Sequence, residues 1–305
     1  GGAALVPLIL MAQFSWAQEP PTDIASEEDE GATDSQYRLQ SVTVTAQKRE
    51  ENINDVGMSI NAFSGEALTR SGISNTADLV RLVPGFNFTP TVYNAPVYTL
   101  RGIGFQEGSL ASSPAVSVYV DEVALAYPAM TLGADLDVER VEVLKGPQGI
   151  LYGQNSTGGA INYIAAKPGD TFDTGIDLSY GRFNELQGGG FISGPLADNL
   201  RGRVALKTIQ SDGWQESYTR NDEHGAQDQW VGRAILEWDP TSSVRLALTA
   251  SGWVNKSDSQ AVQFIGPRVQ IPTSPLAPEI DNYPVSPNDA QAADWDANQN
   301  SSTSL

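Results

Sequence analysis

The chain has 305 residues, of which 40% are apolar, so it is long enough to bury a sizeable hydrophobic core. Its 37 acidic and 18 basic residues give a net charge of −19, which argues against nucleic acid as a partner. The sequence has no cysteine and one histidine, which excludes disulfides, thiolate zinc sites and Cys–His catalysis within these residues. We predict no cofactor and no metal site.

Residues 1–17 are predicted to be an export signal. Their apolar stretch ends in Ser15-Trp16-Ala17, a small-x-small pattern that is typical of signal peptidase sites. The alternative is a buried terminal helix, but the acidic residues that follow give such a helix nothing to pack against. Because the chain opens with Gly1-Gly2 and has no basic residue before the apolar stretch, we expect the natural protein to begin further upstream.

Residues 18–40 are predicted to be a disordered acidic linker, because seven acidic and no basic residues lie between positions 19 and 36. The next segment, residues 41–47, begins with a run that alternates valine and threonine and has no obvious core of its own: Ser41, Val42, Thr43, Val44, Thr45 and Ala46. We expect this run to lie unpacked on the flexible linker, within reach of an incoming strand.

Residues 48–170 are predicted to form a small mixed α/β domain. Ser64 is placed to cap a helix over residues 65–71, and Asn75 starts a second helix that ends before Pro84-Gly85. From Val97 onward, short β-prone runs alternate with glycine turns.

Residues 171–305 are predicted to begin a transmembrane β-barrel. No apolar run reaches the roughly 18 residues that a transmembrane helix needs, so a membrane-spanning form must use strands closed into a barrel. Side chains alternate with a period of two in five segments, which we expect to be strands: 174–183, 187–194, 200–210, 228–238 and 244–254. About five strands leave open edges that lipid cannot satisfy, so we expect the natural protein to extend beyond Leu305.

The two faces of these strands differ in chemistry. Apolar side chains of one parity, such as Leu206 and Leu246, are expected to face lipid, with Leu246 near mid-membrane. Basic side chains of the other parity are expected to face the lumen, where they meet plug carboxylates, attract an anionic ligand or form a hydrated wall: Arg201, Arg203, Lys207, Arg233 and Arg245. Trp230 and Trp238 lie on the apolar face, eight residues apart, at the spacing of two interfacial girdles.

A soluble β-sandwich also alternates, but its strands are usually shorter. The connections favour a barrel, because those on one side are short and those on the other include the long stretch 211–227. His224 lies in this stretch, and we expect it to be solvated rather than a metal ligand.

Several motifs in order carry a family resemblance. VTVTAQKREENINDV starts at Val42, LVRLVPGF at Leu79, and ERVEVLKGPQGILYGQNSTGGAINYIAAKP at Glu139, with Leu100-Arg101-Gly102 and Tyr119-Val120-Asp121 between them. Together they resemble the coupling box and the plug of TonB-dependent outer-membrane receptors. The glycine that usually follows the last aspartate is Glu122 here.

The resemblance implies a mixed α/β plug followed by the first strands of an antiparallel transmembrane barrel, in the outer membrane of a Gram-negative bacterium. It implies that the coupling segment faces the periplasm and pairs with TonB of the inner-membrane energising complex through Val42, Thr43, Val44, Thr45 and Ala46. It also implies that Arg101, Glu139 and Arg140 link plug and barrel, although ordinary ion pairs within the plug are the alternative.

The function implied is energy-coupled import of a scarce nutrient, most often a ferric siderophore or another iron chelate, with no bond made or broken by this chain. Receptors of the same family import carbohydrates, vitamins or other organic nutrients, so the ligand and the residues that bind it stay open. Two alternatives of other classes are a passive porin-like channel and a secreted β-rich hydrolase. The first gives no reason for a plug, and the second lacks a convergent catalytic set.

Overall fold

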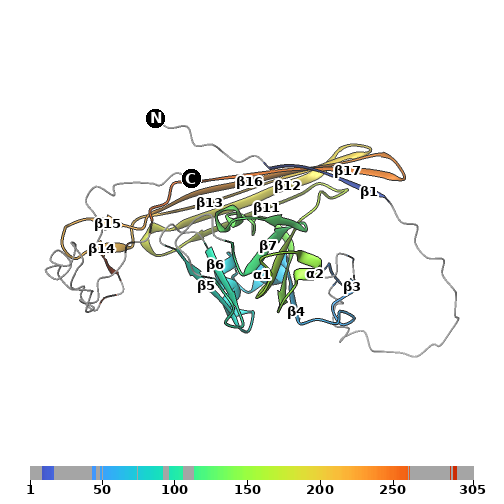
Figure 1. Ribbon diagram of the computed structural model, residues 1–305. Coiled ribbons are helices and arrows are strands. Elements are labelled where there is room, and N and C mark those ends of the chain that lie inside the picture. The colour runs from blue at the N-terminus through green and yellow to red at the C-terminus, as the bar shows by residue number, and fades with distance from the viewer. Residues whose placement is uncertain are drawn as a thin grey trace, which may run out of the picture.

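The computed structural model describes residues 9–16, 43–45, 49, 51–73, 75–91, 96–105, 113–259, 261, 289 and 291–293. A small mixed domain, residues 43–165, packs against one face of a long antiparallel sheet formed by residues 173–255 (Figure 1). We call the domain the plug and the sheet the wall. The predicted fold class is confirmed, and within the described residues the sheet does not close on itself. The predicted linker, Val42 and Ala46 lie outside the described residues.

The plug is built around a five-stranded sheet of order β4-β9-β10-β7-β8, flanked by two smaller strand pairs, β2-β3 and β5-β6. In chain order its elements are β2 (Thr43–Val44), β3 (Glu51–Asn52), β4 (Ile60–Ser64), α1 (Gly65–Arg70), η1 (Thr76–Arg81), β5 (Phe86–Pro90), β6 (Pro96–Leu100), β7 (Val116–Val120), β8 (Val123–Leu125), η2 (Pro128–Thr131), β9 (Val138–Lys145), α2 (Gly149–Tyr152) and β10 (Gly159–Ala165).

The core of the plug lies on its central strands. β10 is buried along its whole length and pairs parallel with β7 and antiparallel with β9, so it has hydrogen-bonded neighbours on both edges. Val118, Val143 and Ile161 each expose 2% or less of their surface. The sequence of a strand buried on both faces is typically a nearly continuous apolar run rather than an alternating pattern.

The predicted helices are confirmed in part. The Ser64 hydroxyl accepts a hydrogen bond from the Ala67 backbone N–H at 3.2 Å and so caps α1, as expected. The Asn75 side chain caps the second helix, but that helix, η1, is a 3₁₀ helix. Among the residues that the structure describes, no helix has the length and apolar character needed to cross a membrane.

The wall has the strand order β1-β17-β16-β13-β12-β11, and each strand between β11 and β17 pairs antiparallel with its neighbour. The five predicted strands are confirmed within a few residues at each end: β11 (Asp173–Tyr180), β12 (Leu186–Ala197), β13 (Leu200–Ser211), β16 (Gln227–Thr241) and β17 (Val244–Asn255). The remaining elements are η3 (Arg182–Asn184), β14 (Gln215–Ser217), β15 (Glu223–His224) and β18 (Ala292–Ala293), and β14 pairs with both β15 and β18.

The predicted difference between the two faces of the wall is confirmed on β13. Val204 and Leu206 point away from the plug and are 46% and 56% exposed, whereas Arg203 and Ala205 lie under the plug and are buried. Trp230 and Trp238 are half-exposed on the outward face.

The depth expected for Leu246 is wrong. Leu246 pairs with Trp238, so it lies beside one of the two tryptophans rather than midway between them. The middle of the outward face is occupied by Ala234, whose partner on β13 is Val204.

β1 (Ile9–Trp16) pairs antiparallel with the otherwise open edge of β17. An edge strand presents unpaired N–H and C=O groups, which an available β-prone segment readily satisfies. This pairing does not test cleavage, so the export signal over residues 1–17 stays a prediction.

Candidate functional site

The two ends of the wall differ in their connections. At one end, only residues 198–199 join β12 to β13, and residues 242–243 join β16 to β17. At the other end, residues 212–226 separate β13 from β16 and carry β14 and β15. We call this the long-loop end, and β3 lies toward the opposite end of the molecule (Figure 1). Outer-membrane barrels place their long connections on the cell exterior.

A cavity of about 300 Å³ opens between plug and wall at the long-loop end, and we call it the loop-end cavity. Its plug side includes Phe88 and Tyr98 from the β5-β6 pair, and its wall side includes Trp214. Amide side chains reach it from strands β16 and β17 and from the plug: Asn75, Gln227, Gln229 and Asn255. Aromatic faces combined with a few polar groups are typical of small-molecule sites.

Two buried tyrosines lie on the plug side: Tyr98 lines the loop-end cavity, and Tyr163 contacts Thr76, another of its lining residues. Tyr98 and Thr131 share a hydrogen bond of 3.0 Å, and Tyr163 donates to the Thr76 hydroxyl at 2.7 Å. Burial raises the pKa of both tyrosines well above the ordinary value. Both side chains therefore stay protonated and neutral over the physiological pH range.

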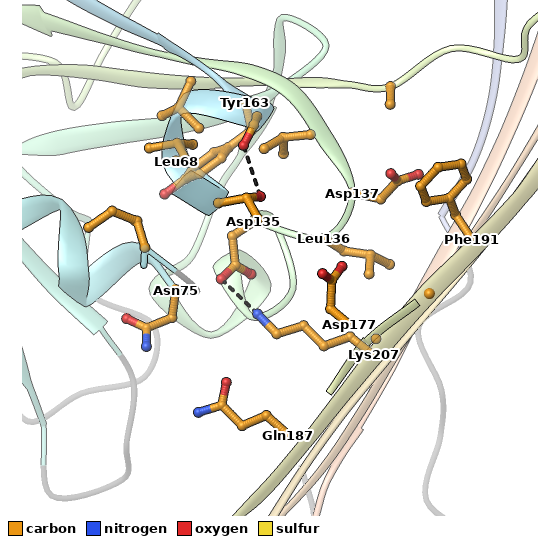
Figure 2. Close-up of a pocket in the computed structure, with 18 of the residues that line it drawn as sticks. Leu68, Asn75, Asp135, Leu136, Asp137, Tyr163, Asp177, Gln187, Phe191 and Lys207 are labelled. Atoms are coloured by element: carbon orange, nitrogen blue, oxygen red, sulfur yellow. Dashed lines mark hydrogen bonds and ion pairs between the residues drawn. The ribbon is translucent and has the colours of Figure 1, made fainter. Parts of the chain in front are cut away.

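A second, larger cavity of about 770 Å³ lies between the plug and strands β11 to β13, and we call it the wall cavity (Figure 2). Asp177, Gln187 and Lys207 reach it from the wall, while Leu68 and Asp135 reach it from the plug. The two cavities share four lining residues: Asn75, Thr76, Asp135 and Lys207.

Three consecutive plug residues contact three inward-facing cations of the wall. Asp135 pairs with Lys207 at 3.3 Å, and the Leu136 carbonyl accepts from Arg233 at 2.7 Å. Asp137 accepts two hydrogen bonds from Arg203, at 2.6 and 2.7 Å. The expectation that lumen-side basic residues meet plug carboxylates is thus confirmed for Lys207 and Arg203.

The other two basic residues of this face make their contacts within or beside the wall. Arg201 contacts Asp170, Glu237 and Asp239 at 2.7 to 3.2 Å, and Arg245 contacts Asp239 at 2.8 Å. These two residues fit the alternative of a charged, hydrated wall.

The contacts found for Arg101, Glu139 and Arg140 lie within the plug. Arg101 donates to the Ser59 hydroxyl at 2.8 Å, and Arg140 binds the neighbouring carboxylates of Glu139 and Glu142. In the described part of the chain they therefore follow the alternative of intra-plug contacts, and their role in linking plug and barrel stays a prediction.

The predicted coupling segment is packed rather than free on a linker, so that expectation is wrong for its described residues. β2 pairs antiparallel with β3, and Val44 is fully buried in a cluster with Val56, Tyr119 and Leu144. The valine–threonine alternation explains the outcome, because it gives the segment one apolar face that the plug can bury. The segment lies outside the five-stranded sheet of the plug, but it forms a two-stranded sheet with β3 of the same domain.

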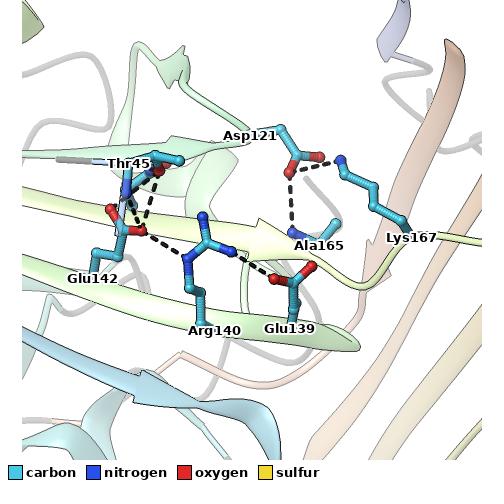
Figure 3. A network of polar contacts seen from close by, with 8 residues as sticks. Thr45, Asp121, Glu139, Arg140, Glu142, Ala165 and Lys167 are labelled. Atoms are coloured by element: carbon cyan, nitrogen blue, oxygen red, sulfur yellow. Dashed lines mark hydrogen bonds and ion pairs between the residues drawn. The ribbon is translucent and has the colours of Figure 1, made fainter. Parts of the chain in front are cut away.

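A buried carboxylate holds this segment in place (Figure 3). Glu142, which is fully buried, accepts from the Thr45 backbone N–H at 2.8 Å and from the Thr45 hydroxyl at 3.1 Å. The Arg140 side chain donates to the same carboxylate at 2.8 Å and compensates its charge. Docking of the segment therefore supplies hydrogen-bond donors to a carboxylate that water does not reach.

The turn after β7 shows a second polar contact (Figure 3). The Asp121 carboxylate accepts from the Ala165 backbone N–H at 3.1 Å and pairs with Lys167 at 3.0 Å. Glu122 stands at the position where the family resemblance predicts a glycine, and it has a positive φ of 66°. The backbone conformation of this turn is therefore one that a glycine adopts at lower cost.

His224 is buried rather than solvated, so that expectation is also wrong. It lies in β15 with 6% of its surface exposed, and its ring nitrogen Nδ1 is 3.7 Å from Asp258. The pairing of β15 with β14 buries the histidine, which local sequence composition did not indicate. Among the described residues there is no cluster of three or more potential metal ligands.

A mixed plug seated on the inward face of an antiparallel wall, with tight turns at one end and a long connection at the other, defines a plugged outer-membrane barrel. Residues 52–160 match the family model described as "TonB-dependent Receptor Plug Domain". The chain therefore belongs to the TonB-dependent receptors, of which it carries the plug and the first barrel strands.

Named relatives agree with this assignment. The chain is 30% identical to the pesticin receptor of Yersinia pestis over 68% of its length, and 27% identical to the ferripyoverdine receptor of Pseudomonas aeruginosa over 64%. These matches cover 31% and 24% of the two relatives. The crystal structure of the ferric yersiniabactin uptake receptor FyuA from Yersinia pestis superposes with a TM-score of 0.60 at 26% identity, covering 68% of this chain and 33% of that one. The chain thus spans about a third of the length of the relatives it matches.

Sequence reasoning missed the plug residues that contact the wall. Asp135 and Asp137 stand directly before the signature that begins at Glu139, but their partners lie 72 and 66 positions further along the chain. The signal in the sequence was a pair of carboxylates just before a buried strand, which could have been expected to contact another part of the protein. Nothing local indicated which cations they meet.

Proposed function

We propose that the full-length protein imports a scarce nutrient across the outer membrane, and that the nutrient is a ferric siderophore or another iron chelate. The names of two relatives support this: a ferric yersiniabactin uptake receptor and a ferripyoverdine receptor. The observation that carries the proposal is the plug itself, which packs on the inward face of the wall with an aromatic, amide-lined cavity at the long-loop end. A passive channel has no use for such a domain.

The nutrient binds in the loop-end cavity, from the cell exterior. Tyr98, Phe88 and Trp214 supply aromatic surface, and the neighbouring amides supply donors and acceptors. The chain itself makes and breaks no bond.

Residues 41–47 are the coupling segment on the periplasmic side, and TonB of the inner-membrane complex binds them by strand addition. Because Val44 is buried and Thr45 is held by Glu142, the segment has to leave the plug before its backbone is available to another strand. Docking therefore keeps the coupling segment away from TonB until the plug changes.

The test is uptake by cells that carry the full-length gene or its deletion, with and without TonB. The probes are radiolabelled ferric yersiniabactin and ferripyoverdine, with radiolabelled cyanocobalamin as the arm without iron. We expect TonB-dependent accumulation of an iron chelate that the deletion abolishes. Equal accumulation without TonB would show passive diffusion and contradict the proposal.

A second candidate within the family is a vitamin. The chain is 27% identical over 72% of its length to the vitamin B12 transporter BtuB of Photobacterium profundum, of which it covers 34%. Accumulation of cyanocobalamin but of neither iron chelate would select this candidate.

A further inference from the structure

We propose that Lys207 and Asp135 form a gate between the loop-end cavity and the wall cavity, so that the imported nutrient passes between the plug and strands β12 and β13. The proposal rests on the import function above and assigns the route within it. It starts from the junction of the two cavities: their shared lining residues are Asn75 and Thr76 at the start of η1, together with Asp135 and Lys207.

The gate pair is the longest of the three neighbouring links between plug and wall. The Lys207 ammonium lies 3.3 Å from the Asp135 carboxylate, at the end of a flexible side chain. Arg203 binds Asp137 through two contacts, and its guanidinium also lies 3.8 Å from the centre of the Phe191 ring.

The third link is also firm, because Arg233 is buried and donates to the Leu136 carbonyl at 2.7 Å. The lysine contact can therefore open while residues 136 and 137 stay attached to the wall.

The wall leaves room beside the gate. Across the inward face, Asp177 on β11 pairs with Gly189 on β12, which pairs with Lys207 on β13. Gly189 has no side chain, and the nearest atom to a Cβ built there is the Leu206 carbonyl oxygen at 3.8 Å. The wall cavity therefore extends along β12 directly beside Lys207, and this is space that the lysine can enter when it leaves Asp135.

The gate closes the path with two opposite charges rather than with a packed side chain. The Lys207 and Asp135 side chains are 17% and 20% exposed, so water reaches both charges after separation. A polar nutrient in the loop-end cavity can replace either partner in its hydrogen bonds, so binding itself competes with the closed state.

The experiment uses the full-length receptor with Asp135→Cys and Lys207→Cys, joined in whole cells by a short bifunctional methanethiosulfonate. Residues 1–305 contain no cysteine, and the parental receptor treated with the same reagent controls for any thiol elsewhere. Radiolabelled ferric yersiniabactin, ferripyoverdine and cyanocobalamin are the probes. We expect the joined receptor to bind its probe but to lose at least about tenfold of its uptake rate, and a reductant to restore the rate.

The matched control joins Asp170→Cys to Arg201→Cys. Arg201 also lies on β13 and contacts Asp170 at 2.7 Å, but neither residue lines either cavity. This receptor should import at the parental rate after treatment. Unchanged uptake by the joined Asp135–Lys207 pair would overturn the gate, whereas a parental receptor that imports none of the probes would overturn the proposed function and the route with it.

If the receptor with both cysteines already fails to import before treatment, a variant with the two charges exchanged tests the gate instead. Asp135→Lys combined with Lys207→Asp restores the attraction in the opposite sense. Uptake by this double variant above that of either single variant supports the gate, and uptake no higher than the single variants overturns it.

Discussion

The plug and the wall bury their side chains in different ways. In the plug, β10 is buried along its whole length, because it has strands on both edges and packed side chains on both faces. In the wall, β13 alternates, with Ala205 buried under the plug and its neighbours Val204 and Leu206 exposed on the outward face. The comparison shows that the wall needs two different environments, whereas the plug needs one dry interior. Each of the following predictions tests this difference between the plug and the wall.

The largest effect is expected in the proposed coupling segment. Val44→Pro removes a backbone N–H and fixes φ in that segment, so we expect binding at the cell surface to persist and energy-dependent uptake to be abolished. Uptake and binding of radiolabelled ferric yersiniabactin and ferripyoverdine measure the two properties.

Because Val44 is buried, Val44→Ala is the matched control. It shortens the side chain but keeps the N–H, so its uptake should stay well above that of the proline variant. Equal loss in both variants would assign the effect to packing, and normal import by the proline variant would remove residues 41–46 from coupling.

The next effect concerns the contact between the two regions. Asp137→Ala leaves the Arg203 guanidinium, 10% exposed, without its bidentate partner, and breaking a buried pair in this way costs about 3–5 kcal/mol. Denaturant unfolding of the full-length receptor in lipid vesicles measures the loss.

Glu66→Ala is the control on the plug surface. Glu66 and Arg70 lie 3.9 Å apart and are 80% and 71% exposed, so removal of this pair should cost no more than about 0.5 kcal/mol. Similar losses for both variants would mean that the plug does not shield the Arg203–Asp137 pair from water.

The outward face gives a third, depth-dependent test. Val204 lies midway between the levels of Trp230 and Trp238, so Val204→Arg should destabilise the receptor in vesicles by about 2–4 kcal/mol. Val244, at the start of β17 beside the short turn, should tolerate the same change at about 0–1 kcal/mol. A face that meets water instead of lipid would show no dependence on depth.

The smallest effect is expected at one turn of the plug. Glu122 holds a positive φ, so Glu122→Gly should stabilise the plug by about 1 kcal/mol. Glu122→Ala removes the same side chain but keeps the backbone strain, so it should give no such gain. A thermal unfolding series with the two variants separates the backbone effect from any side-chain contact.

The sequence predicted the wall better than the plug, for a physical reason. Residues 200–208 alternate because one face meets the plug and the other faces outward, and that alternation is visible in any short window. The docking of Thr45 on Glu142 joins residues 97 positions apart, and no local pattern encodes it. The candidate site has the same property, since the two cavities exist only where η1 and other plug segments meet wall strands β11, β12, β13, β16 and β17.

The short pairing of β2 with β3 determines how the plug responds to mechanical load. Thr43 pairs with Asn52 and Val44 pairs with Glu51, so the chain enters β2 and leaves β3 at the same end of the ladder. A pull applied from the N-terminal side therefore loads Thr43 and Asn52 first and opens the ladder one pair at a time, as a zipper opens. The same two strands would share the load if they were sheared lengthwise. The ladder that holds the proposed coupling segment is thus oriented in the direction in which backbone ladders yield at the lowest force.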